Sequence, residues 1–495
     1  MSKTWYLVAA VAAAMVLPVG ASAQGNKDAV VVGMVLEPPG LDPTTGAAAA
    51  IGEIVHYNLF EGLTKITQNG SVAPLLAESW TVTPDAKVYT FKLLKGVKFH
   101  NGNAFTSADV KDTFERDGAE KSLNKRKAIF ANMAKIDTPD PSTVVITLKE
   151  PNPQLPFSLG ENTAVILDPS TAANDATQPI GTGPFKFENW VKGSSVTLVK
   201  ASTYRDPAAI KLNKVTFKFI ADPSAQVAAM LAGDVDALPT FASPENVKQF
   251  QADPRFTVTV GTTEGETILA MNNKRKPFDD IRVRRAISYA IDRKAIIDGA
   301  MYGFGTPIGS HFAPHQPAYI DLTGVYPHDP EKAKALLKEA GFANGLEMTL
   351  KLPPPAYARR GGEIIAAQLA KVGIKAKIEN VEWAAWLSGV YKNKDFDLTI
   401  VSHVEPLDIS IYANPDYYFQ YDSKDFRDIM AKADAALDVK ERTKYYQEAQ
   451  RKLAEDAPNA FLFELAKISI AKKGLMGLWT NAPIFANDMT AVHWQ

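Results

Sequence analysis

The sequence predicts a mixed α/β fold divided into two large lobes, and three observations support this prediction. The chain has 495 residues, which exceeds the length of about 300 residues at which single hydrophobic cores stop growing. Hydrophobic residues make up 46% of it, an ordinary share for globular domains. Short β-branched runs follow one another between apolar stripes of helical period. We therefore expect strands and helices shared between two cores.

The first 23 residues have the pattern of a secretory signal peptide. Lys3 is the charged end, residues 5–19 are apolar, and small residues at Ala21 and Ala23 precede the expected cleavage after Ala23. The apolar run is shorter than the ~18 residues that a spanning helix needs, which favours cleavage over a permanent anchor. We expect an exported chain that begins near Gln24.

Composition excludes several classes of protein. The chain has no cysteine, so it offers no site for lipid attachment, no thiolate nucleophile and no disulfide. Its formal net charge of −1 does not suggest binding to nucleic acid or to an anionic membrane. An exported protein without a lipid-bearing cysteine is expected in the periplasm.

The amino-terminal part predicts a strand, a rigid loop, a helix and a second strand. Residues 30–35 are a β-branched run, and the prolines of the loop at residues 37–43 prevent regular pairing after it. Residues 51–59 follow as a helix, with Gly62 at the position after its end. Residues 88–93 alternate and are rich in β-formers, as in a strand.

The next helix has a clear amino-terminal signal. Thr106 or Ser107 offers a cap, Asp109 places a carboxylate in the first turn, and Val110 and Phe114 continue the apolar face. After this helix the chain returns to β-rich runs. Strands are expected at residues 144–148, 196–199 and 215–220.

The remaining part predicts further helices and one strand. Gly233 ends a helix at residues 223–231, and Gly341 ends one at residues 330–340. Asp279 or Asp280 caps a helix with a single apolar stripe, formed by Val283, Ala286, Ile287, Ala290 and Ile291. The other expected elements are a helix at residues 363–371, a strand at residues 396–401 and a helical tract from about residue 425 to 455.

Several motifs together resemble one family. The block AESWTVTPDAKVYTFKLLKGVKFHNGNAFTSADVKDTFER at residues 77–116 is the most specific. Similar matches are EPPGLDP at 37–43, PIGTGPFKF at 179–187, LAGDVD at 231–236 and PFDDIRVRRAISYAIDRKAI at 277–296. These motifs resemble the extracellular solute-binding proteins of family 5, which include the dipeptide-, oligopeptide- and nickel-binding proteins of ABC importers.

The resemblance implies a two-lobed periplasmic-binding-protein clamp of the large α/β class, with two hinge crossovers between the lobes. Residues 24–270 would form lobe I, with an extra subdomain at about 75–179. Residues 271–463 would form lobe II, and residues 464–495 would return to lobe I. The implied function is to capture a solute and deliver it to a membrane permease.

Catalytic signatures are missing from the sequence. It contains no G-x-x-x-x-G-K-(S/T) phosphate loop, no G-x-S-x-G elbow and no H-E-x-x-H zinc motif. Gly181 and Gly183 lack the third glycine of a dinucleotide site and are interpreted as a turn. We therefore expect a protein that is not an enzyme and needs no cofactor, with ATP hydrolysis carried out by a partner chain.

Histidines give only a weak indication of metal binding. His311 and His315 are four residues apart, but Pro314 between them argues against a shared helical face. We expect a loop with ordinary structural roles and assign no metal site. The resemblance to nickel carriers keeps a metal chelate open as a ligand.

The segment that follows the strand at residues 396–401 is the expected ligand loop, because ligands of open α/β lobes gather at the carboxyl ends of strands. In dipeptide-binding relatives an aspartate here pairs with the α-ammonium of the ligand. In this chain Glu405 and Asp408 flank that position, and either is a candidate anchor. His403 stands where the relatives have an aromatic platform.

Other candidate contacts lie on both lobes. Trp383, Trp386 and Tyr417 offer aromatic surface for ligand side chains. Arg359 or Arg360 is a candidate for binding a ligand carboxylate through its planar fork. Glu37 belongs to the proline-rich loop, which lies beside the cleft in the family.

The expected ligand is a short peptide or an amino-acid-derived compound with an ammonium group. A metal chelate or an oligosaccharide is the alternative within the same receptor role. A periplasmic hydrolase or a chaperone-like peptide binder is the alternative from another class. The expected partners are the permease and ATPase subunits of an ABC importer, and the expected state is a monomer.

Overall fold

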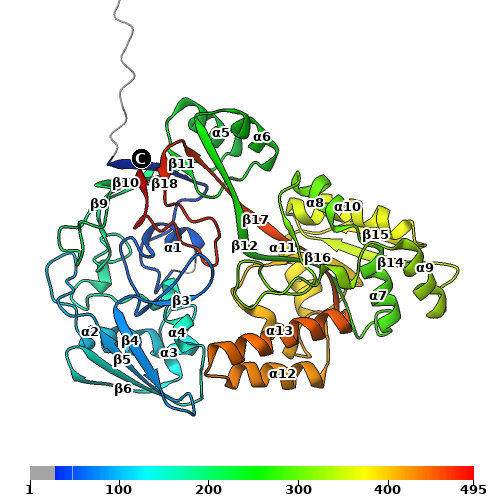
Figure 1. The fold of residues 1–495 in the computed structure, drawn as a ribbon, viewed down its shortest axis with the longest axis horizontal. Helices are drawn as coiled ribbons and strands as arrows, with labels where there is room; N and C mark the ends of the chain where they lie inside the picture. Colours follow the sequence, from blue (N-terminus) through cyan, green and yellow to red (C-terminus); the bar gives the residue numbers. More distant parts are fainter. Residues whose placement is uncertain (1–27, 47) are drawn as a thin grey trace, which may run out of the picture.

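The computed structural model describes residues 28–46 and 48–495, and the predicted signal peptide at residues 1–23 lies outside them. The chain forms two lobes that share one 11-stranded sheet (Figure 1). Its main strand order is β15-β14-β16-β12-β17-β11-β1-β10-β9-β8, with β13 also paired to β17. The prediction of a two-lobed α/β clamp is confirmed.

Two long antiparallel strands connect the lobes. They are β12, Phe256–Met271, and β17, Asn459–Lys472. At one end β17 pairs with β11, Ala237–Leu238, and at the other end β12 pairs with β16, Leu398–His403. The pairing of β12 with β17 shifts register between Thr262 and Glu266. The two crossings between the lobes are therefore neighbouring strands, with an irregularity at their middle.

The amino-terminal lobe packs its part of the large sheet against a hydrophobic core that contains Val32, Phe60 and Phe217. The strands are β1 Ala29–Met34, β8 Phe185–Val191, β9 Ser195–Lys200 and β10 Lys214–Phe219, and the helices are α1 Ala49–Val55, α5 Pro223–Ala232 and α6 Val247–Ala252. A short β2–β3 pair lies at Thr64–Ile66 and Val72–Pro74.

A separate four-stranded sheet lies at the lower end of this lobe in Figure 1. Its order is β4-β5-β7-β6, and it has its own core, which includes Phe91, Phe114 and Ile146. Its elements are β4 Ala77–Val82, β5 Val88–Leu93, β6 Met133–Asp140, β7 Thr143–Leu148, α2 Ser107–Gly118, α3 Lys127–Ala131 and α4 Leu155–Ser158.

The second lobe packs helices on its part of the large sheet around two cores. One core contains Ile287, Leu350 and Ile400, and the other contains Phe312, Tyr412 and Phe461. The elements are α7 Ile281–Ala290, α8 Arg293–Met301, α9 Pro330–Glu339, α10 Ala356–Ala370, α11 Trp383–Ala385, α12 Lys424–Ala435, α13 Val439–Asp456, β13 Thr306–Pro307, β14 Leu346–Leu352 and β15 Ile374–Asn380. The chain ends with β18, Leu475–Met476, and β19, His493–Trp494.

Local sequence signals explain several helix boundaries. Thr106 and Asp109 form a reciprocal capping box at the start of α2, as the sequence predicted. The Asp280 carboxylate accepts a hydrogen bond from the Arg282 backbone and caps α7. Gly233 ends α5 with φ of 86°, a left-handed conformation that costs glycine little.

Other predicted boundaries are wrong. Helix α1 ends at Val55, so Gly62 does not follow a helix and instead pairs with Val165 in an isolated bridge. Helix α10 starts at Ala356, seven residues before the predicted start at 363. The predicted tract at residues 425–455 is two helices, because Ala436 leaves the helical conformation and Asp438 caps α13 through the Glu441 backbone.

Strand β16 also ends later than predicted, at His403 instead of residue 401. His403 therefore stands on the sheet itself, where the long pairing with β12 fixes its backbone. Within the described part of the chain, no helix is both long and apolar enough to cross a membrane.

Candidate functional site

Strand β16 and the turn that follows it bring the candidate ligand residues to the junction of the lobes. His403 is the last residue of β16 and pairs with Glu266 of β12. The loop then turns at Leu407, whose φ is 57°, into a 3₁₀ turn at Asp408–Ala413. A left-handed conformation costs a branched residue of order 1 kcal/mol, so the surrounding packing must hold this turn.

The carboxylate of Asp408 is paired with two histidines. Oδ1 lies 2.7 Å from Nε2 of His311, and Oδ2 lies 3.4 Å from Nδ1 of His403. Burial raises the pKa of Asp408, but the two imidazoles outweigh burial and hold it below the ordinary value of an aspartate. Asp408 is therefore ionised and has a partner for each oxygen.

Tyrosine hydroxyls contact the far side of both imidazole rings. The Tyr412 hydroxyl lies 3.4 Å from Nδ1 of His311, and the Tyr418 hydroxyl lies 3.2 Å from Nε2 of His403. The Tyr412 oxygen also accepts a 3.0 Å hydrogen bond from Asn459 of β17. These contacts fix the orientation of both rings.

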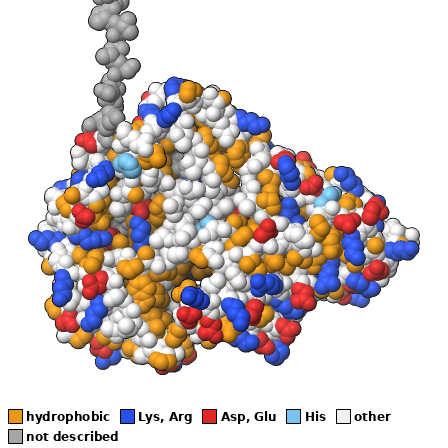
Figure 2. All heavy atoms as spheres, in the orientation of Figure 1, with side chains coloured by type: hydrophobic (Ala, Val, Ile, Leu, Met, Phe, Trp, Pro, Cys, Tyr) orange, Lys and Arg blue, Asp and Glu red, His pale blue; other side chains and the backbone are white. Residues whose placement is uncertain are grey.

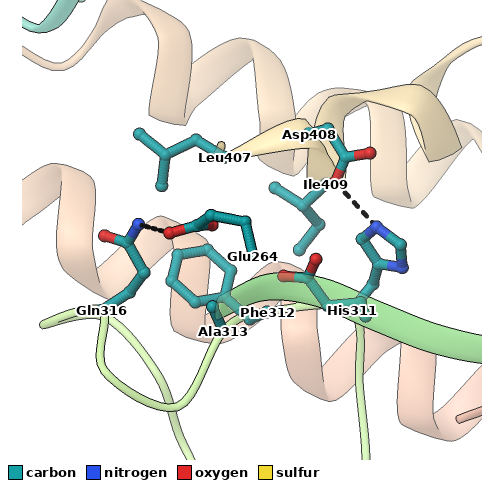
Figure 3. Close-up of a pocket in the computed structure, with 9 residues that line it drawn as sticks. Glu264, His311, Phe312, Ala313, Gln316, Leu407, Asp408 and Ile409 are labelled. Carbon is teal, nitrogen blue, oxygen red and sulfur yellow. Dashed lines mark hydrogen bonds and ion pairs between the residues drawn. The ribbon is translucent and has the colours of Figure 1, made fainter. Parts of the chain in front are cut away.

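A narrow pocket with acidic walls lies beside this cluster (Figure 3). Its lining includes Asp408 and His311 from one side and Glu264 and Glu266 from the irregular middle of β12. The Glu264 carboxylate accepts a 2.7 Å hydrogen bond from the Gln316 amide. The Glu264 carboxylate also lies 2.8 Å from Nε2 of His315.

Glu266 is the least satisfied member of this group. Its side chain is 3% exposed, and its Oε2 has no hydrogen-bond partner among the described residues. Burial raises its pKa well above the ordinary value, and the charges of Glu464, Asp408 and Glu264 raise it further. Burial has the same effect on the pKa of Glu464. The junction of the lobes thus gathers several carboxyl groups in a place closed to solvent, where burial favours their protonated form.

Glu405 differs from Asp408 in its surroundings. Its side chain is exposed, and its contact in the structure is a 3.3 Å hydrogen bond from the Val404 backbone. Glu405 lies near enough to the amino-terminal lobe for its charge to add to the raised pKa of Arg126, which is held mainly by Glu161. Glu405 therefore offers a carboxylate to the space between the lobes.

A row of aromatic rings leads from His403, two residues before Glu405, along the second lobe. Tyr417 lies 6.2 Å from His403 and 5.7 Å from Tyr391, measured between ring centroids. Trp386 then lies 6.3 Å from Tyr391 and 5.6 Å from Trp383. Trp383 and Tyr391 are 40% and 44% exposed. Trp386 is buried, and its indole donates a 2.9 Å hydrogen bond to Thr399.

The arginine candidates lie inside α10 and not before its start. Arg359 donates a 2.9 Å hydrogen bond to Glu382, the residue before Trp383, so it lies at the far end of the aromatic row. Arg360 donates to the Tyr302 hydroxyl at 2.8 Å and stacks on that ring. Figure 2 shows charged side chains of both signs spread over both lobes, without a large patch of one sign.

The Glu37 side chain is hydrogen-bonded to other residues of the amino-terminal lobe. Its Oε1 accepts hydrogen bonds of 2.9 Å from the Trp190 indole and 3.0 Å from the Gly193 backbone. These contacts attach the proline-rich loop to the β8–β9 hairpin. Of the predicted ligand residues, the structure brings together His403, Glu405, Asp408, Tyr417, Trp386 and Trp383, with Arg359 adjacent.

Sequence reasoning missed His311, Glu264 and Glu266 as members of this site. The spacing between His311 and His315 is not what matters, because each histidine pairs with a different carboxylate. The available signal was the Thr-Thr-Glu-Gly-Glu-Thr segment at residues 262–267, where two acids stand in a β-rich run. Alternation alone would place both carboxylates on one face of a strand.

Comparisons with known proteins agree with this architecture. The family described as bacterial extracellular solute-binding proteins, family 5 Middle, matches residues 71–426. The glutathione-binding protein GsiB of Escherichia coli strain K12 is 29% identical over 463 residues, which cover 89% of each chain.

Two solved structures are similar over nearly the whole chain. The binding protein AgaA of A. tumefaciens R10, in complex with agropinic acid, has a TM-score of 0.73 and 29% identity, covering 94% of this chain and 98% of its own. DppA of Helicobacter pylori, in complex with the peptide STSA, has a TM-score of 0.71 and 27% identity, with the same coverage.

Proposed function

Because this chain belongs to the bacterial extracellular solute-binding proteins of family 5, we propose that it captures a short peptide or an amino-acid-derived compound between its two lobes. The observation that carries this proposal is the aromatic row that ends at His403, two residues before the exposed Glu405. Apolar surface with a few placed polar groups is typical of small-molecule sites.

Glu405 is the proposed anchor for an ammonium group. It is exposed toward the cleft, whereas both oxygens of Asp408 are already paired with histidines. A charge-assisted hydrogen bond to a carboxylate that is partly shielded from water is strong enough to orient a ligand. In this proposal Asp408 and His403 position the loop that presents Glu405, and Tyr417 packs against the ligand.

Arg359 is the proposed partner for a ligand carboxylate. It lies at the Trp383 end of the row, opposite Glu405, and its present partner Glu382 is exposed and easily exchanged. A zwitterion that lies along the row would then meet one charge at each end. Trp383 and Tyr391 would supply an exposed apolar wall, and the buried Trp386 would support it. Arg360 and Glu37 are not assigned a ligand contact, because each is hydrogen-bonded to another residue of the chain.

The proposed role in transport follows from the family. Closure of the lobes on the ligand would shift the molecule toward a form that docks on an ABC permease, and ATP hydrolysis would belong to a separate subunit. We propose that the chain acts in the periplasm as a monomer after cleavage of residues 1–23. We also propose that it performs no catalysis itself, in line with relatives that are named as binding proteins.

Relatives with different cargo define the alternatives. GsiB is named for glutathione, and the AgaA complex contains agropinic acid. Both names fit the amino-acid-derived class that the Glu405 end of the row favours. A sugar would need neutral polar partners beside the indoles, and the row ends instead in charged groups. Hydrolysis of a bound peptide would favour the hydrolase alternative.

The test is calorimetric titration of the purified protein with di- and tripeptides and with sugar and amine conjugates of amino acids. A hit is then measured against Glu405→Gln and against the N-acetylated form of the same ligand. We expect each change to weaken binding at least tenfold, which is about 1.4 kcal/mol. The exposed Glu347, on β14 of the same lobe, provides the control Glu347→Gln, which should bind like the unaltered protein.

Combining the two changes makes the test sharper. If Glu405 contacts the ammonium group, the N-acetylated ligand should bind Glu405→Gln no more weakly than it binds the unaltered protein. Independent, additive losses would show that Glu405 and the ammonium group do not meet. Binding of sugars alone would remove the amino-acid class from the proposal.

A further inference from the structure

We propose that His311, His403 and Asp408 form a binding site for a divalent transition-metal ion at the junction of the two lobes. The proposal goes beyond capture of an amino-acid-derived solute. The ligand would be a free metal ion, and the binding atoms would belong to His311, His403 and Asp408 instead of Glu405 and Arg359. Nε2 of His311, a ring nitrogen of His403 and a carboxylate oxygen of Asp408 all lie within 4.8 Å of one another. No such group was expected from the sequence.

The donor set has the chemistry of a transition-metal site. Two imidazoles and one carboxylate are the protein ligands of many zinc and iron centres, which leave further positions open. At bond lengths of about 2.0–2.2 Å, neighbouring ligand atoms lie about 3 to 3.5 Å apart. Asp408 contacts each ring through a different oxygen, at 2.7 Å to His311 and 3.4 Å to His403, so the side chains must rearrange for one ion to reach all three.

The hydrogen bonds around the rings can accommodate an ion. In the structure the ring nitrogens that face Asp408 donate protons to it, and the far nitrogens accept from the Tyr412 and Tyr418 hydroxyls. When an ion takes the near nitrogens, each neutral ring moves its proton to the far nitrogen. The tyrosine oxygens then accept, since a hydroxyl can donate or accept.

Carboxyl groups line the pocket beside the three proposed ligands. Glu264, Glu266 and Asp408 line one pocket, and Glu464 lies close enough to affect the pKa of Glu266. A buried carboxyl group is either protonated or paired with a cation, and a divalent ion beside this pocket would favour the ionised form.

Glu266 gives the second, independent indication of a ligand. Its Oε2 is buried in the lining of the pocket and has no partner in the described part of the chain. A buried carboxylate oxygen without a hydrogen bond is rare in folded proteins and calls for an explanation. An ion beside Asp408 would supply the missing positive charge, with Glu266 outside the three direct ligands.

The test is equilibrium dialysis of the full chain, stripped with EDTA, against Zn²⁺ or Ni²⁺ alone, with bound metal measured by mass spectrometry. We expect one ion per chain for these borderline ions and none for Ca²⁺, which prefers a cage of oxygen ligands. Asp408→Asn and His403→Gln should each weaken binding at least tenfold. The exposed His328 provides the control His328→Gln, which should retain one ion.

Because these side chains are buried, each variant is checked for folding by thermal unfolding. X-ray absorption of the Zn²⁺-loaded unaltered protein needs no variant and should show two imidazole ligands. Failure to bind either ion, binding unchanged in both variants, or a spectrum without imidazole would overturn the proposal. Binding of Ni²⁺ only together with added histidine would overturn it as well, because the ion would then be part of a chelate cargo.

The test of the metal site and the test of the proposed solute site can fail independently. Solute titrations in EDTA test the Glu405 site without metal, and dialysis without solute tests the Asp408 site without cargo. A protein that binds a peptide but no metal would overturn only the metal site. A protein that binds the metal but no solute would leave the metal site standing and remove the proposed cargo.

Discussion

Asp408 joins His311 and His403, two histidines that stand 92 residues apart in the sequence, through a single buried carboxylate. One histidine comes from the loop after β13, and the other ends β16. The contact therefore fastens the ligand loop to the body of the second lobe. Glu405, three residues earlier, is free of such pairing and exposed.

This difference predicts separate effects of two neutral substitutions on stability. Asp408→Asn removes the charge that both imidazoles face, and a hydrogen bond to a charged group is worth about 1.5–3 kcal/mol. Glu405→Gln changes an exposed side chain, so the free energy of unfolding should shift by less than about 0.5 kcal/mol. Urea unfolding of both variants measures the two effects. Equal losses would show that Glu405 also has a structural role.

The buried ion pair of Glu61 with Arg205 predicts a large stability effect in the amino-terminal lobe. Arg205 contacts both carboxylate oxygens, at 2.7 and 2.8 Å, and Thr182 donates to one of them at 2.9 Å. Glu61→Gln leaves a half-buried guanidinium without its counter-charge, and such losses amount to about 3–5 kcal/mol.

A matched control for this pair lies on the surface. Glu347 is 2.8 Å from Lys375, and both side chains are about three-quarters exposed. Glu347→Gln should therefore lower the free energy of unfolding far less than Glu61→Gln, because exposed ion pairs contribute little. Guanidinium unfolding of both variants gives the comparison. A loss at Glu61 as small as that at Glu347 would mean that solvent reaches the Glu61 pair.

The sequence predicted well those parts of the fold that local chemistry determines. The cap at Thr106, the cap at Asp280 and the stop at Gly233 depend on residues within one helical turn of each other. The start of α10 was predicted at residue 363, seven residues too late. Instead Pro355 precedes the helix directly, a place that proline tolerates well.

The candidate site was predicted only in part, because its contacts are long-range. Glu405, Asp408 and His403 come from one segment, the end of β16 and the turn after it. The rule that ligands gather at strand ends selected this segment, and the resemblance to dipeptide-binding proteins selected the residues. His311 and Glu266 reach Asp408 or its pocket from other segments, and no local spacing records that. Nor does sequence show that Asp408 is already paired while Glu405 is exposed.

The close packing around Gly181 predicts that adding a side chain there would strongly lower stability. A Cβ atom there would lie 2.0 Å from the carbonyl oxygen of Leu59, a backbone atom that cannot move aside. Gly181→Ala should therefore lower the free energy of unfolding by at least about 2 kcal/mol, in the range of overpacked sites. Gly324→Ala is the control, because among the described atoms nothing lies within 4 Å of its Cβ position. Thermal unfolding of both variants tests this, and equal melting temperatures would contradict the steric argument.

The buried carboxyl group of Asp175 predicts a pH dependence of stability. Its Oδ1 accepts a 3.0 Å hydrogen bond from the Ile180 backbone, but Oδ2 is without a partner in the described structure. Burial raises its pKa to about 7, and the charge of Asp42 adds to that effect. The folded protein therefore holds a proton that the unfolded chain, with an aspartate pKa of about 3.9, has already lost.

The sign follows from this difference in bound protons. Between about pH 4 and pH 7 the folded state binds more protons than the unfolded state, so the free energy of unfolding falls as pH rises through this window. Asp175→Asn keeps the Ile180 hydrogen bond through its amide oxygen and removes the titration. We expect the loss of stability from pH 5 to pH 8 to be smaller in this variant than in the unaltered protein by about 2–3 kcal/mol. Asp112→Asn, on the exposed face of α2, should follow the unaltered protein at every pH. Urea unfolding across this range measures all three proteins, and parallel profiles for Asp175→Asn and the unaltered protein would show that Asp175 is ionised in the fold.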